Sequence, residues 1–320
     1  MQRIAFIDQL KGLAMLMVVF GHLLQFCFGV KTCMAEVILE TFDLPLFFLI
    51  SGYFCFRTSP RFSDIAKKAR AYLVPFVAVG SFFFFTHGQI VVEQMIINGG
   101  GKYWFLYYLF LVSAVCIVLN IFVCWMERGK PKWWLDALVY GSAFLAFAIV
   151  KLRVGELPHW LPIDKFATYF RYFVVGMMLR KYTRFYDFWM RSDWLYALGF
   201  IVFVVGVYYS SQTNSLLIML STLGALVVLW RFMSSLEHQD NIALRALTYI
   251  GQYTLSIYVF HYFFLFDLHQ ASAVLVGSSQ FVLQIAACMF ACLLIVPCCI
   301  LVDRMIERSK WLRLLILGKR

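Results

Sequence analysis

Charged residues are scarce in this sequence of 320 residues: only 14% are Asp, Glu, Lys or Arg, while 62% are hydrophobic. The mean hydropathy of +0.79 is too high for a soluble domain of this length. A soluble enzyme or a soluble binding module is therefore excluded. The composition predicts an all-α fold, in which a bundle of helices crosses a membrane several times.

Features typical of metal sites, disulfide frameworks and separate domains are also absent. The nine cysteines never occur as Cys-x-x-Cys, and they fall mainly in apolar runs. We expect them to be small packing residues, so neither a metal site nor a disulfide is predicted. No repeat of fixed period, low-complexity tract or long linker interrupts the chain. One transmembrane domain is therefore expected over residues 1–320.

Acidic residues are outnumbered, 17 against 28 Lys and Arg, which gives a net charge of +11. If the N-terminus is inside, 22 of the 28 basic residues fall in cytoplasmic segments, including the loops at 57–71 and 180–193. Both termini are therefore expected in the cytoplasm. The basic excess indicates topology and contact with anionic headgroups, and it needs no nucleic acid to explain it. About ten spans are expected, near residues 10–30, 37–56, 72–86, 103–125, 133–150, 166–180, 194–210, 214–232, 247–267 and 280–302.

The first apolar run carries two ionisable residues, Lys11 and His22. Such side chains are costly at membrane depth and are usually retained for function. Eleven helical residues make three turns plus roughly 20°, so both side chains leave one face, about 16 Å apart along the axis. The cation suits an anionic ligand from the cytoplasm, and the imidazole suits proton transfer from a hydroxyl. The structural alternative is a lysine that snorkels or pairs with Asp8, and a histidine bonded to a neighbouring helix.

A second motif begins at Asp43 and continues as Pro-Leu-Phe-Phe-Leu-Ile-Ser-Gly-Tyr over residues 45–53. The proline starts or kinks a helix, and the Ser51-Gly52 pair permits close approach of another helix or of a ligand. Small residues in membrane helices usually serve packing, so this motif alone assigns no function.

Five segments together resemble the integral membrane acyltransferase-3 family. In that family the first helix carries a basic residue, then ten intervening residues and a histidine. Lys11 and His22 have this spacing, and Lys11 belongs to the segment Asp-x-Leu-Lys-Gly at 8–12. The second helix carries Pro-Leu-Phe-Phe-x-x-Ser-Gly, which residues 45–52 reproduce. Three later segments are also similar, and the ordered set covers nearly the whole chain. They are Tyr-Trp-Phe-Leu at 103–106, Arg-Tyr-Phe-x-x-Gly at 171–176 and Ser-Ile-Tyr-x-x-His at 256–261.

The resemblance implies an enzyme that transfers an acyl group, usually acetyl, from cytoplasmic acyl-CoA to a hydroxyl of a glycan or lipid-linked saccharide. It implies that His22 is catalytic and that Lys11 contacts the donor. Acetyl-CoA is then a co-substrate, and no bound cofactor is expected. The natural setting is a bacterial inner membrane, crossed several times by the chain. The resemblance leaves the oligomeric state open.

The sequence departs from the family pattern at three points. Lys11 replaces the more usual arginine, so it would contact a phosphate as a point charge. Asp43 stands where many members have a histidine; a carboxylate could orient a hydroxyl or His22, but it is not an imidazole base without a large pKa shift. The basic cluster before the third span lies farther from Pro75 than usual. Its charge suits the phosphates of CoA and membrane topology equally well. The cluster consists of Lys67, Lys68 and Arg70.

Further candidates would bind the acceptor or stabilise the oxyanion of the transition state. Arg171 needs polar partners at membrane depth: it could clamp a glycan, stabilise an oxyanion or pair with a buried carboxylate. Trp104 could stack on a sugar or belong to an interfacial aromatic belt. Tyr258 and His261 share one face of the ninth span, and His261 belongs either to the site or to the packing. With Asp43 and Ser51, the candidates are Asp43, Ser51, Trp104, Arg171, Tyr258 and His261.

In the expected mechanism, acyl-CoA docks against Lys11 and the cluster at 67–70, and His22 is the general base for the acceptor hydroxyl. In a variant, His22 is itself acylated and relays the group. A secondary transporter or flippase would also use ionisable residues in the membrane, but the sequence has no inverted repeat to support it. An inactive scaffold is disfavoured, because the pair of Lys11 and His22 is intact.

Overall fold

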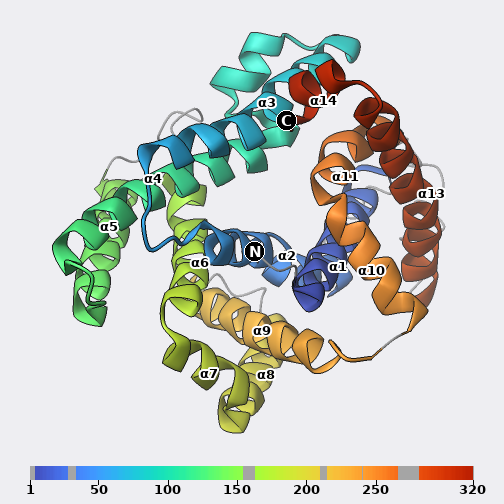
Figure 1. Cartoon of the computed structure of the whole chain (residues 1–320). Coiled ribbons are helices and arrows are strands. Elements are labelled where there is room, and N and C mark those ends of the chain that lie inside the picture. The colour runs from blue at the N-terminus through green and yellow to red at the C-terminus, as the bar shows by residue number, and fades with distance from the viewer. Residues whose placement is uncertain are drawn as a thin grey trace. The chain divides into compact units, whose positions relative to one another are not determined.

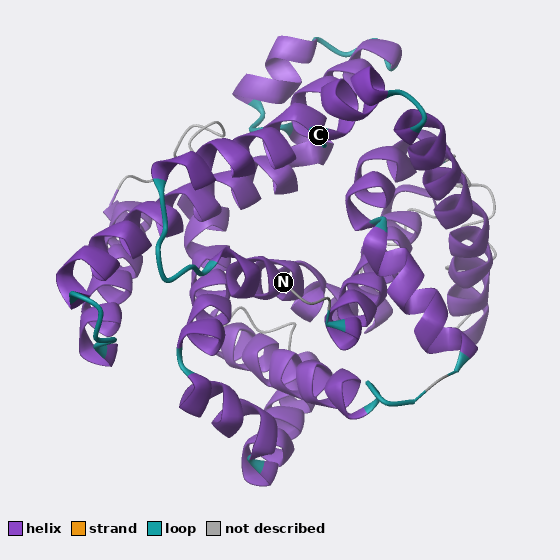
Figure 2. Ribbon diagram, viewed as in Figure 1, coloured by secondary structure: helices purple, strands orange, loops and turns teal. Residues whose placement is uncertain are grey.

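The computed structural model describes residues 4–27, 34–153, 163–209, 215–239, 241–265 and 281–319. All regular secondary structure in these ranges is helical, and they contain no strand (Figure 2). The predicted all-α class is therefore confirmed.

Thirteen α-helices are present in the described ranges, together with short π and 3₁₀ turns. The α-helices, labelled in Figure 1 where space allows, are α1 Ala5–His22, α2 Met34–Cys55, α3 Phe62–Thr86, α4 Trp104–Glu127, α5 Trp133–Arg153, α6 Ile163–Lys181, α7 Thr183–Arg191, α8 Asp193–Tyr208, α9 Ser215–Ser235, α10 Ile242–Gln252, α11 Thr254–Phe260, α13 Phe281–Glu307 and α14 Lys310–Leu317. The short turns are η1 Leu23–Cys27, η2 Glu93–Ile97, η3 Gly101–Tyr103 and η4 His261–Phe264.

Among the described residues, six helical segments are long and apolar enough to cross a membrane. The consecutive helices α7 and α8 form a seventh candidate, bent by 68° at their junction. Two further apolar segments, Thr41–Cys55 and Thr254–Phe264, are shorter. The length and composition of these helices identify a multi-pass membrane protein. Each of the ten expected ranges contains a helix, while the number of about ten spans stays a prediction. The six segments are Ala5–Cys27, Phe62–Thr86, Glu93–Glu127, Trp133–Leu152, Leu216–Ser235 and Ile285–Glu307.

The helices group into two compact units that alternate along the chain. Unit 1 comprises residues 1–47 and 184–304, and unit 2 comprises residues 48–183 and 305–320. The boundaries fall inside α2 and near the end of α13, so both helices contribute to both units. The expectation of one domain over residues 1–320 stays a prediction.

In unit 1, α1 packs against α10, and α8 packs against α9 (Figure 1). Glycines bring α1 and α10 into backbone contact at two points. A Cβ atom at Gly12 would lie 2.1 Å from the carbonyl oxygen of Leu247, and one at Gly251 would lie 1.8 Å from that of Asp8. Any larger residue would push the two helices apart, so these contacts fix how α1 and α10 are aligned.

In unit 2, α4 packs against α3, α5 and α6, and α14 packs against α3. Glycines also join α2 to α6. A Cβ atom at Gly52 would lie 2.0 Å from the carbonyl oxygen of Phe173, and one at Gly176 would lie 1.9 Å from that of Leu49. Gly52 belongs to the Ser51-Gly52 pair, so the close approach predicted there is an approach of a helix.

Candidate functional site

His22 is the last residue of α1, where regular α-helical geometry ends. The following turn, η1, is a π-helix, a feature that often marks functional sites. Lys11 lies in the same uninterrupted helix, so Lys11 and His22 leave α1 from one face, as the spacing predicts. His22 is partly exposed.

His22 is hydrogen-bonded to His261, which follows 239 residues later. The distance between His22 Nδ1 and His261 Nε2 is 2.8 Å, and the two ring planes differ by 7°. His261 opens the 3₁₀ turn η4 and is completely buried. The fold thus brings together two residues that sequence patterns marked separately as candidates for the site.

The protons of this histidine pair can be assigned from the acceptors that they face. His261 Nδ1 lies 2.9 Å from the carbonyl oxygen of Ile257, which can only accept, so Nδ1 carries a proton and donates it. In a neutral His261, Nε2 is then an acceptor, and His22 Nδ1 is the donor between the two rings. The other nitrogen of a neutral His22, Nε2, therefore carries a lone pair. A lone pair on an imidazole that is held in one orientation is what a general base requires.

Tyr262 completes this cluster. Its hydroxyl lies 3.3 Å from His22 Nε2, and in that contact the hydroxyl is the donor. A hydroxyl group thus already occupies the position that an acceptor hydroxyl would need. Sequence patterns did not point to Tyr262, because neighbouring helical residues diverge by about 100° and Tyr262 therefore does not share the face of His261. Its place beside His261 in the chain was the only signal.

Tyr258 and Asp43 are the other predicted site residues of unit 1, besides Lys11. Tyr258 is buried one turn before His261, with 6.1 Å between the ring centroids. Asp43 is buried in α2, and its Oδ1 accepts a hydrogen bond of 2.6 Å from the backbone nitrogen of Leu44. Part of the hydrogen-bonding capacity of this carboxylate is therefore used within its own helix.

Lys11 forms an ion pair with Asp8, with 3.0 Å between Nζ and Oδ1. The predicted alternative of local pairing is thus confirmed. The aspartate is nearly buried, whereas a quarter of the lysine side chain is exposed. A phosphate that binds at Lys11 would have to compete with this carboxylate.

The predicted basic cluster lies near the start of α3, in unit 2. Lys67 Nζ lies 2.8 Å from Asp64 Oδ1, and 59% of the lysine side chain is exposed. Lys68 Nζ lies 3.2 Å from the hydroxyl of Tyr72. Arg70 is partly exposed. The cluster therefore presents positive charge to its surroundings while each lysine also has a partner inside the chain.

Trp104 opens α4, also in unit 2, and carries a lysine over its ring. Lys165 Nζ lies 3.9 Å from the centroid of the Trp104 ring. The ring of Tyr169 lies 5.8 Å from that of Trp104 and stacks on Phe48 at 4.5 Å. This group of rings with one cation suits either predicted role of Trp104, stacking on a sugar or anchoring at the interface.

Arg171 and Ser51 are the remaining candidates of unit 2. Arg171 is partly exposed, and its guanidinium lies 4.9 Å from the ring centroid of Tyr172. Its Nε is buried and has no hydrogen-bond partner among the described residues. A buried donor without a partner is costly, so this arginine suits an anionic or polyhydroxyl ligand. Ser51 is partly exposed in α2, one residue before Gly52.

Residues 4–304 match the family model described as an acyltransferase domain. The chain belongs to the acyltransferase-3 family. The match spans nearly the whole chain and confirms the resemblance that the five sequence segments predicted. No curated protein and no solved structure matches the chain.

Membership in the acyltransferase-3 family means that the protein acts on an acyl donor and an acceptor. It favours membrane acyl transfer over the secondary transporter or flippase that intramembrane ionisable residues would also suit. The roles of individual residues stay predictions, since a family match over the chain assigns none of them.

This acyltransferase-3 chain has a second buried polar cluster, which sequence patterns did not reveal. Lys181, at the end of α6, lies 2.7 Å from Glu127 Oε1 and 2.6 Å from Asp136 Oδ2, and the three side chains are 3–6% exposed. The hydroxyl of Tyr182 also donates to Asp136, and burial together with this carboxylate raises the pKa of Tyr182. The positive-inside rule placed Lys181 in a cytoplasmic loop at 180–193, whereas the structure places it in ion pairs that join α4, α5 and α6.

Proposed function

We propose that this protein transfers an acyl group, in the first instance acetyl, from cytoplasmic acyl-CoA to a hydroxyl of a glycan or lipid-linked saccharide, with His22 as general base. The observation that carries the proposal is the hydrogen bond between His22 and His261. It leaves the Nε2 lone pair of His22 directed at a hydroxyl, that of Tyr262. The membrane would be the inner membrane of a bacterial cell.

The proposed reaction uses His22 twice. Nε2 takes the proton of the acceptor hydroxyl while the hydroxyl oxygen attacks the carbonyl carbon of the thioester. The C–S bond then breaks, and the imidazolium returns the proton to the leaving thiolate of CoA. His261 accepts from Nδ1 of His22 throughout, so the ring keeps its orientation when it becomes charged.

In the relay variant, Nε2 of His22 attacks the thioester itself, CoA leaves, and the acyl group passes from the imidazole to the acceptor hydroxyl. This variant uses the same lone pair and the same support from His261. Both routes therefore predict that His22 is indispensable. They differ in whether CoA is released before an acceptor is present.

The substrate contacts are proposed by residue chemistry. Lys11 and the cluster of Lys67, Lys68 and Arg70 would bind the phosphates of CoA. On the acceptor side, Trp104 would stack on a sugar. Arg171 would bind a polar group or the oxyanion through its guanidinium, whose buried Nε has no hydrogen-bond partner in the part of the chain that the structure describes. Asp43, Ser51 and Tyr258 are the remaining acceptor candidates. We propose no bound cofactor or metal.

The experiment that tests this proposal compares the wild type with His22→Ala, each purified in lipid. Binding of radiolabelled acetyl-CoA and transfer of label to the saccharide fraction of bacterial membranes are measured. We expect both proteins to bind the donor, and transfer by the variant to fall by roughly 10²–10⁴-fold, the usual effect of removing a general base.

His87→Ala serves as the matched control, since His87 is exposed at the end of α3. It should leave binding and transfer unchanged. Thermal unfolding of each protein shows whether it is folded. Full transfer by a folded His22→Ala protein would refute the role of His22, and absence of donor binding by the wild type would refute acetyl-CoA as the donor.

A further inference from the structure

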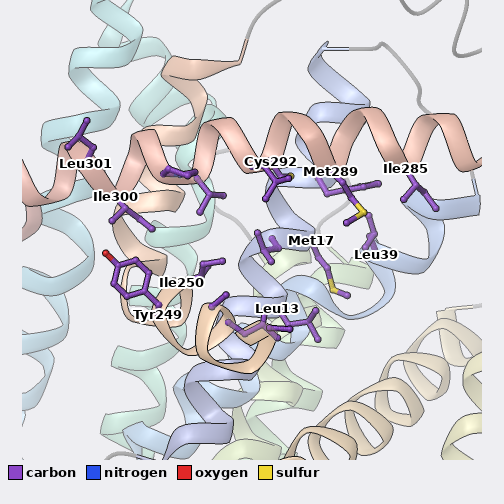
Figure 3. A pocket seen from close by; sticks show the side chains of 18 of the residues that line it. Leu13, Met17, Leu39, Tyr249, Ile250, Ile285, Met289, Cys292, Ile300 and Leu301 are labelled. Carbon is purple, nitrogen blue, oxygen red and sulfur yellow. The ribbon is translucent and has the colours of Figure 1, made fainter. Parts of the chain in front are cut away.

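An apolar groove of about 1010 Å³ lies in unit 1 and is lined by α1, α2, α10 and α13 (Figure 3). Side chains such as Leu13, Met17, Ile250 and Met289 point into it. Among the described residues that line it, Arg304 is the only charged one. The volume is at the upper end of the range for small-molecule sites in proteins.

This groove is separate from the histidine site. On α1 it is lined by residues such as Leu13 and Phe20. Leu13 lies two positions after Lys11, and Phe20 lies two positions before His22. Two positions correspond to about 200° around a helix. The groove therefore occupies the face of α1 opposite to Lys11 and His22.

The length of the groove matches the apolar depth of a membrane. Its lining on α13 extends from Ile285 to Arg304, a rise of roughly 28 Å at 1.5 Å per residue. The hydrocarbon layer of a bilayer is about 30 Å thick. The segment Ile285–Glu307 is also among those long and apolar enough to span a membrane. The groove thus lies along a membrane-spanning helix, where lipid chains are the available apolar ligand.

The Arg304 end of the groove has the chemistry of an anion site. Arg304 donates to the hydroxyl of Tyr249 at 2.9 Å and to that of Tyr253 at 3.4 Å. No carboxylate of the described residues lies within 4.0 Å of the guanidinium. Because both hydroxyls accept from Arg304, each keeps its own proton to donate. A cation and two hydroxyl donors without a carboxylate suit a phosphate.

We propose that the groove binds a membrane phospholipid with an anionic headgroup. Its acyl chains lie along α13 against the apolar lining, and its phosphate is bound by Arg304, Tyr249 and Tyr253. The orientation expected from the basic residues places this end at the cytoplasmic leaflet, where anionic lipids attract arginine. This inference concerns a site apart from acyl transfer and does not depend on the proposed reaction.

The test uses native mass spectrometry of the full-length protein, first delipidated and then given phosphatidylglycerol or phosphatidylcholine. We expect the wild type to retain phosphatidylglycerol about fivefold better, since one arginine near a lipid headgroup contributes an interaction of that size. Arg304→Gln should lose this preference, and Arg304→Lys should keep most of it. Arg308→Gln, which removes an exposed arginine outside the groove, should behave as the wild type.

A second pair of variants tests the apolar part of the groove. Leu293→Trp places a larger ring among the lining residues, whereas Leu294→Trp places one on an exposed neighbour outside the lining. We expect only Leu293→Trp to reduce retention of both lipids, by at least fivefold. Equal retention by the two tryptophan variants would overturn the proposal, as would an unchanged lipid preference in Arg304→Gln. A lipid-free dimer that Leu293→Trp converts to a monomer would instead assign the groove to contact between copies of the chain.

Discussion

The polar cluster around Lys181 and the polar cluster around His22 differ in how their ionisable groups are satisfied. In unit 2, the ammonium of Lys181 meets two carboxylates, those of Glu127 and Asp136, and all three side chains are at most 6% exposed. In unit 1, His22 is partly exposed and meets the ring of His261 and the hydroxyl of Tyr262. Ion pairs hold the first cluster together, while hydrogen bonds join the three side chains of the second.

This difference separates a structural cluster from a reactive one. A buried ion pair gains little from exchanging protons with a substrate, because loss of either charge leaves the other uncompensated. An imidazole that is oriented by one nitrogen and presents a lone pair on the other can take up a proton without breaking the cluster. Burial of an ionisable group is therefore a weaker sign of function than a lone pair that the group can present to a substrate.

The largest effect that we predict breaks the structural cluster. Lys181→Met leaves the carboxylates of Glu127 and Asp136 buried without their cation, which should lower the free energy of unfolding by about 3–5 kcal/mol. Thermal or denaturant unfolding in detergent measures this loss. The fraction that stays folded should transfer acyl groups as well as the wild type, because Lys181 has no proposed part in the reaction.

Lys130→Met is the matched control, since it removes an exposed lysine from the loop between α4 and α5. Its unfolding should match that of the wild type. Equal stability of the two variants would show that the Lys181 ion pairs add nothing to the fold.

The next effect concerns the reactive cluster. His261→Gln removes the ring that accepts from Nδ1 of His22, so His22 loses its fixed orientation. We expect kcat for acyl transfer to fall roughly 100-fold, near the lower limit for loss of the base itself, with KM for the donor unchanged. Steady-state kinetics with acetyl-CoA separates the two constants.

His87→Gln controls for loss of a histidine outside the cluster. A change in the donor KM that accounts for the whole loss in His261→Gln would give His261 a role in donor binding rather than in orienting His22. A loss of folded protein without any change in kcat of the remainder would make it a packing residue.

The smallest effect concerns the hydroxyl of Tyr262. This hydroxyl occupies the lone pair of His22 that an acceptor needs, and one hydrogen bond contributes about 0.5–1.5 kcal/mol. Tyr262→Phe should therefore lower KM for the acceptor by roughly two- to tenfold and leave kcat unchanged. If kcat instead drops more than tenfold, the hydroxyl is a required proton donor and not a placeholder for the acceptor.

Composition and periodicity predicted the parts of this protein that depend on single helices. The all-α class follows from the hydropathy, and the common face of Lys11 and His22 follows from the helical repeat, because both are local properties. The family pattern added His261, but the contact of its ring with His22 joins residues 239 positions apart and could not be read from spacing.

The Lys181 cluster shows what a sequence pattern cannot distinguish. A lysine at the end of a helix, beside other basic residues, has the same sequence pattern whether it faces the cytoplasm or a buried carboxylate. Its partners Glu127 and Asp136 lie 54 and 45 positions away, on other helices. Only the packing of α4, α5 and α6 distinguishes a topology signal from an ion pair.

Because of the glycine contacts between α1 and α10, the number of residues between each glycine and the histidine that follows it is part of the site. From Gly12 to His22, and from Gly251 to His261, the chain advances by ten residues, so two segments with the same number of residues run from the glycine contacts to the contact between the histidines. One residue inserted between Gly12 and His22 would turn the imidazole by about 100° and raise it by about 1.5 Å. The two rings would then miss each other, although every side chain at the site and the hydropathy of the helix were retained. The distance counted in residues is thus as essential to this site as the identity of its histidines.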